Sequence, residues 1–256
     1  MEFFAPLHYH ALNGIKIKVD VMKGAKDMPE QSPAFKKESE SVEKLPLNPL
    51  REGEIGVLLA SAGAGKTACL THLAISHLLG GEPVLHVCVD LLPDRVKLWY
   101  HELLKSLFPN LPEGDISGLQ HSIEPLRFIM SFMNQTFSPG KLEQSIENLR
   151  EQTKFTPSLL IVDGLDFNRN GRDVFEQMRD IAGRHSLRAW FSARMHRHIS
   201  DVNERGIPYP VNNLDDLFSS ILMLQTEGEA IRLKILKENE SFNPLDSEVL
   251  LDPHTF

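Results

Sequence analysis

Short apolar runs alternate with longer amphipathic stretches over most of the chain, from about residue 45 onward. Brief apolar runs between turn residues are typical of buried strands, and longer stretches with one apolar face are typical of helices. The pattern predicts strands over 55–60, 84–89, 158–162, 189–192, 220–224 and 231–236. It predicts helices over 66–79, 94–107, 141–152 and 173–185, and a further helix around 124–132. This alternation indicates repeated βα units, and therefore an α/β fold with a mostly parallel β-sheet flanked by helices.

The N-terminal region has a different pattern. An alternating run over 15–21, preceded by the turn dipeptide Asn13-Gly14, predicts a small hairpin. From Lys23 to Lys44 the chain is polar and mixed in charge, so it buries too little apolar surface to offset its ordering entropy. We therefore expect residues 1–44 to form an N-terminal hairpin and flexible arm, and residues 45–256 to form the main domain.

Composition excludes several classes of protein. The 256 residues are 41% apolar and 24% charged, which excludes a fibrous or wholly disordered chain. No apolar stretch reaches the roughly 18 residues that a membrane span needs, and the N-terminus lacks the pattern of a secretory signal. Cys69 and Cys88 lie in apolar segments, as buried reduced thiols do. We therefore expect a cytoplasmic protein. Its net charge of −8 disfavours a broad nucleic-acid-binding surface, so any contact with nucleic acid would be local.

The sharpest chemical signal is the segment ASAGAGKT over 60–67, which joins an apolar strand to a periodic helix. It matches the phosphate-binding loop GxxxxGK[S/T], except that Ala60 stands where the first glycine usually does. Small residues let the backbone curl its N–H groups toward phosphate oxygens, and the following helix adds its positive end. The expected nucleotide-binding residues are Ser61, Ala62, Gly63, Ala64, Gly65, Lys66, Thr67 and Ala68. The alternative is a glycine-rich turn with an exposed lysine, which the order of strand, loop and helix disfavours.

A second signal is the run LLIVD over 159–163, an apolar strand that ends in a carboxylate. In a parallel sheet this carboxylate would lie at the same edge as the phosphate loop. We expect Asp163 and Thr67 to hold Mg²⁺, and Lys66 to contact the β and γ phosphates of ATP. The alternative for Asp163 is a turn aspartate before Gly164.

Together these motifs resemble the RecA-like P-loop ATPase superfamily, and within it the KaiC-type branch, over about residues 45–251. The resemblance implies that residues 45–256 form a RecA-like nucleotide-binding domain, with a catalytic carboxylate after the strand that follows the loop helix. Asp90 occupies the first position of the glutamate pair found there in KaiC-type proteins, and Leu91 the second. Asp90 could therefore orient the attacking water, with slow turnover because aspartate is one methylene shorter than glutamate. The alternative is a turn or helix-capping residue.

The resemblance assigns three further positions near the C-terminal half. It implies that Ser192 senses the γ-phosphate, although a serine satisfied by the local backbone is the alternative. It places a possible DNA contact in the loop over 195–210, where basic residues also suit an ordinary exposed loop. Lys237 matches a lysine that reaches a neighbouring subunit's nucleotide in KaiC-type rings, and the alternative is a solvated lysine. Asn239 replaces the arginine of that motif.

His196 and His198 could bind a metal as a pair, but they lack a third ligand nearby.

The leading functional hypothesis is a Mg²⁺-dependent ATP-binding protein that hydrolyses ATP slowly and couples its nucleotide state to assembly or partner binding. The resemblance also implies a homo-oligomer. One alternative is a regulatory nucleotide-binding module with negligible hydrolysis, which the pair Asp90-Leu91 and Asn239 favour. Another is a DNA-associated repair or recombination accessory ATPase, which rests on the basic loop and on what the resemblance to RecA-like proteins implies. A GTPase is disfavoured because no Asn-Lys-x-Asp segment is present.

Overall fold

The computed structural model describes residues 50–133, 135–195, 201–228, 230–243 and 248–251, and the backbone of two short strands near the N-terminus. The strands of the main sheet are β3 (Ile55–Ser61), β4 (Val84–Val89), β5 (Arg127–Phe132), β6 (Leu159–Asp163), β7 (Arg188–Met195), β8 (Ser220–Glu227), β9 (Ala230–Glu238), β10 (Ser241–Phe242) and β11 (Glu248–Leu251). The helices are α2 (Lys66–Leu79), α3 (Pro93–Leu107), α4 (Glu113–Ile123), α5 (Pro139–Thr153) and α6 (Arg172–Arg184), with a 3₁₀ turn, η1 (Glu124–Leu126). This arrangement confirms the predicted α/β fold with a mostly parallel sheet.

The order of the strands brings the two predicted motifs to one edge of the sheet. The order is β10-β9-β8-β3-β7-β6-β4-β5, with β11 also beside β9. The strands from β8 to β5 are parallel, and β9 pairs antiparallel with β8. Because parallel strands end at the same edge, the loop after β3 lies at the edge where β6 ends, with only β7 between them.

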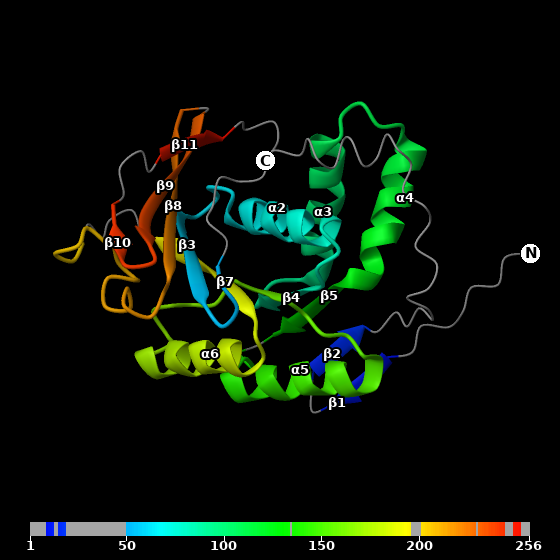
Figure 1. The fold of residues 1–256 in the computed structure, drawn as a ribbon, viewed down its shortest axis with the longest axis horizontal. Helices are drawn as coiled ribbons and strands as arrows, with labels where there is room; N and C mark the ends of the chain where they lie inside the picture. Colours follow the sequence, from blue (N-terminus) through cyan, green and yellow to red (C-terminus); the bar gives the residue numbers. More distant parts are fainter. Residues whose placement is uncertain are drawn as a thin grey trace, which may run out of the picture.

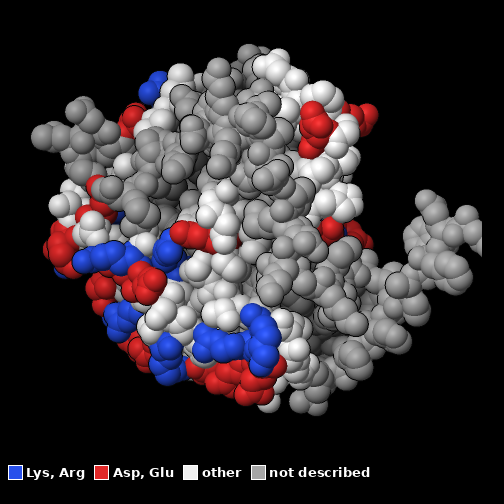
Figure 2. Space-filling view, turned by 45° about the vertical axis from the view of Figure 1, so that its right-hand side comes forward, with Lys and Arg blue, Asp and Glu red and all other residues white. Residues whose placement is uncertain are grey.

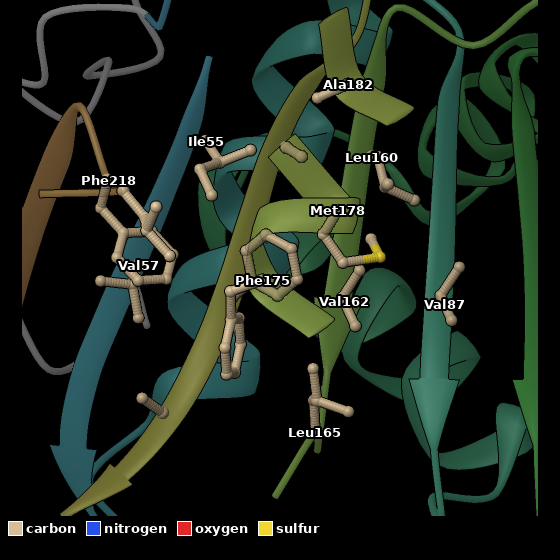
Figure 3. Packing of buried hydrophobic residues seen from close by; sticks show 14 of the residues in the cluster. Ile55, Val57, Val87, Leu160, Val162, Leu165, Phe175, Met178, Ala182 and Phe218 are labelled. Atoms are coloured by element: carbon tan, nitrogen blue, oxygen red, sulfur yellow. The ribbon is translucent and has the colours of Figure 1, made fainter. Parts of the chain in front are cut away.

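Helices cover both faces of the sheet, with α2, α3 and α4 on one side and α5 and α6 on the other (Figure 1). Alternation along each strand divides the core accordingly: Leu58 of β3 belongs to the cluster beneath α2, and Val57 to the cluster beneath α6. Figure 3 shows Phe175 and Met178 of α6 packed against this second cluster, which includes Val162 of β6. These buried side chains hold the strands in a fixed register, and so position the loop residues that follow each strand.

The segment 124–132 corrects one prediction, because residues 127–132 form β5 and not a helix. β5 pairs in parallel with β4 along its whole length. Its side chains alternate between the two core clusters, with Met130 and Phe132 on one face and Ile129 on the other. A short apolar run fits a strand or a buried helix equally well, so the pairing with β4 decided the outcome.

Helix α4 was not predicted. It carries Gly114 and Gly118, which lower helix propensity. Its buried residues Ile116, Leu119 and Ile123 nevertheless follow a helical spacing and join the core cluster beneath α2 and α3. Packing therefore stabilises a helix whose local sequence is a weak helix former.

The KaiC-type resemblance also implies a short helix over about 213–218, and this expectation is wrong, because the chain forms successive turns there. These turns contain hydrogen bonds between residues three apart, such as that from the Leu214 N–H to the Val211 carbonyl. The carbonyl of Asn212 accepts a bond from the Asn203 side chain, and that of Asp215 accepts one from Lys237. Carbonyls that a regular helix would use are thus bonded to distant side chains.

The N-terminal strands β1 (Tyr9–Leu12) and β2 (Ile15–Lys18) pair antiparallel as a separate two-stranded sheet. The arm expected over 23–44 lies outside the described residues. Cys69 of α2 and Cys88 of β4 are free and buried, as predicted, and burial raises the pKa of both thiols to about 12. None of the helices described in the structure is both long and apolar enough to cross a lipid bilayer.

Candidate functional site

The loop between β3 and α2 leaves open space above its backbone. Gly63 and Gly65 have φ of 77° and 89°, and a Cβ added to either would meet no described atom within 4 Å. These glycines are therefore needed for the left-handed path of the backbone and not for close packing. α2 begins at Lys66 with neither a side-chain cap nor an acidic residue in its first turn. Its free amides and positive dipole end are thus available to an anion above the loop.

Lys66 lies back across this loop. Its Nζ donates hydrogen bonds to the carbonyl of Ala60 at 3.0 Å and to that of Ser61 at 2.9 Å. Burial lowers the pKa of Lys66, Asp163 opposes this effect, and Arg194 adds to it. Ala60 itself is fully buried in the core beside α2, so its methyl group does not obstruct the loop. The amine is thus held at the mouth of the loop, where a phosphate could replace two neutral carbonyls with charge-assisted bonds.

Thr67 and Asp163, 96 positions apart in the sequence, meet at the start of α2. The Thr67 hydroxyl donates a hydrogen bond of 2.7 Å to Oδ2 of Asp163. Asp163 is only 3% exposed, and its charge acts to raise the pKa of Lys66, the residue before Thr67. Mg²⁺ prefers oxygen ligands, and a hydroxyl and a carboxylate this close together could both bind one Mg²⁺ ion. The residues present therefore fit the predicted metal site.

The turn after Asp163 is held by two constraints. Gly164 has φ of 93°, and a Cβ at this position would lie 2.3 Å from the carbonyl oxygen of Val89. The Gly164 N–H donates a hydrogen bond of 2.9 Å to the hydroxyl of Ser192 on β7. Ser192 is buried, so it serves at least to fix the end of β6, and its role as a phosphate sensor stays a prediction.

Asp90 lies at the same edge of the sheet, just beyond the point where Cys88 of β4 pairs with Asp163. Its backbone has φ of 54°, and its N–H donates to the Phe132 carbonyl at 2.9 Å. Its Oδ1 accepts a long hydrogen bond of 3.4 Å from the Gln135 N–H. Asp90 is exposed and so remains accessible to water, and its catalytic role stays a prediction.

Lys237 and Asn239 lie at the opposite edge of the sheet from the loop. The Asn239 N–H donates to the Ser219 carbonyl, and the Ser219 N–H in turn donates to the carbonyl of Ile55, where β3 begins. The alternative of a solvated Lys237 is wrong, because this side chain is only 5% exposed and donates to the Asp215 carbonyl at 2.8 Å. Burial lowers its pKa. Lys237 therefore cannot reach its own chain's loop, and a role at a neighbour's site stays a prediction.

The loop over 195–210 is only partly described, and His196, Arg197 and His198 lie outside the described residues. Arg205 pairs with Asp215 at 3.1 Å, and its guanidinium lies 5.0 Å from the centre of the Phe242 ring. An open surface depression of about 460 Å³ is lined by Arg172, Asn203, Glu204, Arg205, Asn212, Asn213, Asp215 and Asp216. Arg172 pairs with Asp216 there, so both arginines are matched by carboxylates.

Charge on the surface is mixed as well. Figure 2 shows lysines and arginines lying among aspartates and glutamates on the coloured part of that face. Neither this view nor the described part of the basic loop favours a broad nucleic-acid contact, which would need cations free to meet phosphates.

The sequence interpretation missed Arg194, which pairs with Ala60 in the ladder between β7 and β3. Its neighbour Met195 pairs with Ser61, the last residue before the loop. The signal that could have found it was its spacing of two from Ser192 on one strand, which puts both residues on the same face. The sequence could not show which strand lies beside β3, and therefore did not connect Arg194 with the phosphate loop.

No protein-family model and no curated protein matches this chain. Its fold is similar to that of a solved ATPase domain, with a TM-score of 0.59 over 81% of this chain and 84% of that one. The two sequences are 10% identical, so the likeness shows a common fold alone. The chain therefore has the RecA-like fold that its motifs predicted, whereas the KaiC-type assignment stays a prediction.

Proposed function

We propose that this chain binds ATP with Mg²⁺ and hydrolyses it slowly, and that the nucleotide state changes its assembly or its binding to a partner. One observation carries the proposal: the hydroxyl of Thr67 meets the carboxylate of Asp163 at 2.7 Å, beside Lys66 and the open loop. This contact forms only because the end of β3, the start of α2 and the end of β6 lie together. The solved ATPase domain with the same fold supports the proposal at the level of architecture.

Each residue of the site has a separate task in this proposal. The loop amides and the start of α2 bind phosphate oxygens, and Lys66 pairs with the charge of the outer phosphates. Thr67 and Asp163 hold Mg²⁺, which when bound neutralises charge on the phosphates. The hydrogen bond from Gly164 to Ser192 keeps Asp163 oriented. Asp90 orients the attacking water and accepts its proton.

The test is phosphate release from Mg-ATP by the wild-type chain and by Lys66→Ala. We expect slow release above background, reduced at least about tenfold in the variant, because a positioned cation is lost from the phosphates. Lys105→Ala, which removes a half-exposed lysine from α3, is the matched control and should behave like wild type. Equal rates for wild type and Lys66→Ala would rule out the proposed site.

A regulatory module without significant hydrolysis is the second candidate, and the surroundings of Asp90 favour it. The Asp90 carboxylate faces a backbone N–H of Gln135, and Leu91, at the second acidic position, lies against Gly164. This candidate predicts that Mg-ATP raises the unfolding temperature while phosphate release stays at background. No shift at saturating nucleotide would contradict both candidates.

We also propose a homo-oligomer of the KaiC type, because Lys237 and the phosphate loop lie at opposite edges of one subunit. Lys237 is buried and bonded to the Asp215 carbonyl, so it would have to leave this contact before it could reach a neighbour's nucleotide. A cytoplasmic location is proposed on the two free, buried cysteines.

A further inference from the structure

The end of β7 places a cation beside the phosphate loop. Arg194 pairs with Ala60, and the next pair in the ladder, Met195 with Ser61, is the last before β3 gives way to the loop. In a parallel ladder, paired residues on neighbouring strands lie about 5 Å apart. The Arg194 backbone is therefore next to the two carbonyls that hold Lys66.

Alternation along β7 directs Arg194 to the face that carries α2. Trp190 belongs to the core cluster beneath α2, and the Ser192 hydroxyl binds Gly164 at the end of β6. The intervening Phe191 and Ala193 belong to the opposite cluster. Arg194 continues the first set, so its side chain leaves the strand on the face where α2 begins.

No described residue is an ion-pair or hydrogen-bond partner of the Arg194 guanidinium, and the side chain is exposed. Its backbone nevertheless lies beside the strand end whose carbonyls hold Lys66. Lys66 and Arg194 thus bring two cations to the edge of the sheet where Asp163 and Asp90 also lie. Two cations beside the loop suit a ligand that carries several negative charges.

We infer that Arg194 contacts the terminal phosphate of the triphosphate bound by its own chain, so that the site distinguishes ATP from ADP. This inference rests on the proposed function and deepens it. A guanidinium presents several donors in a plane and binds phosphate oxygens in pairs, which suits recognition of a terminal phosphate. It also supplies within one chain a cation that Asn239 cannot supply to a neighbour.

The experiment measures dissociation constants for Mg-ADP and for the Mg complex of adenylyl imidodiphosphate, a slowly hydrolysed ATP analogue, by titration calorimetry. We expect Arg194→Ala to bind the analogue at least about tenfold more weakly than wild type, because charge-assisted bonds to the terminal phosphate are lost. Its affinity for ADP should stay within about twofold. Arg194→Lys should fall between the two proteins, because it keeps the charge but not the planar donors.

Arg179→Ala is the matched control, since it removes the same charge from an exposed position of α6 on the other face of the sheet. It should bind both nucleotides like wild type. If Arg194→Ala binds the analogue as wild type does, or loses affinity for both nucleotides equally, the inference is overturned while the proposed nucleotide site stands. If wild type binds neither nucleotide, both proposals are overturned. ADP binding by the variant also reports that it is folded.

Discussion

Gly164 is the residue whose replacement the site can least accept. A Cβ there would approach the Val89 carbonyl to 2.3 Å, and φ of 93° is a conformation that side chains rarely adopt. We expect Gly164→Ala to lower the free energy of unfolding by about 2 kcal/mol or more, through backbone strain and displacement of β4 from β6. Denaturant unfolding measures this loss, and nucleotide binding should weaken because the turn that orients Asp163 moves.

Gly118 of α4 provides the control for this substitution. It is exposed, and an added Cβ would meet nothing within 4 Å. We expect Gly118→Ala to raise the free energy of unfolding by about 0.5–1 kcal/mol, because alanine loses less backbone entropy in a helix. A loss in Gly118→Ala as large as that in Gly164→Ala would show that the close contact with Val89 is not the cause.

The sequence predicted the position of some residues and not of others. Lys66, Thr67 and Asp163 were predicted because each belongs to a local motif whose spacing specifies its chemistry. The burial of Lys237 was not predicted, because it depends on turns that bring the Asp215 carbonyl to it from elsewhere in the chain. Local spacing carries no information about such a contact.

At the scale of elements, α5 and α6 are joined by a charged contact on the face opposite the site. Glu143 accepts hydrogen bonds from Arg184 at 2.7 Å and from His185 at 3.2 Å. Burial opposes ionisation of Glu143, but the bonds from Arg184 and His185 outweigh it, so the pKa of Glu143 is lowered. The ionised carboxylate therefore ties the start of one helix to the end of the other.

This lowered pKa gives the contact a defined pH dependence. The folded state binds a proton on Glu143 less readily than the unfolded state, so the contribution is complete above the ordinary glutamate pKa of about 4.3 and is lost as pH falls below it. We expect Glu143→Gln to lower the free energy of unfolding by about 1 kcal/mol at pH 7, because Arg184 is half-exposed and solvent screens the pair. The difference from wild type should shrink below about pH 4.

Denaturant unfolding at about pH 7 and about pH 3.5 provides the measurement, since these values lie on either side of the ordinary glutamate pKa. Glu151→Gln is the control, because Glu151 lies about two turns further along α5 and is exposed. It should change stability by no more than about 0.3 kcal/mol at either pH. A Glu143→Gln deficit that is equally large at both values would show that packing, and not charge, stabilises the helix pair.

At the scale of the whole molecule, the proposed function links nucleotide binding to stability and to mass in solution. A ligand that binds only the folded chain stabilises it by RT ln(1 + [L]/Kd), about 2.7 kcal/mol at a concentration of 100 Kd. We expect Mg-ATP to stabilise wild type by this amount and Lys66→Ala by much less. Light scattering should show a larger mass with Mg-ATP than without it. Stabilisation without a change in mass would retain the nucleotide site and remove the proposed assembly.

The sequence by itself determined the α/β class, the glycine-rich loop between β3 and α2 and the carboxylate that ends β6, because strand and helix periodicity and the loop motif are local properties. The tertiary structure decided that 127–132 is a strand, since only pairing with β4 distinguishes the two conformations of a short apolar run. It also decided that Arg194 lies beside the loop, because this depends on β7 lying next to β3. Contacts between distant segments depend on strand order and register, which are properties of the packed sheet as a whole.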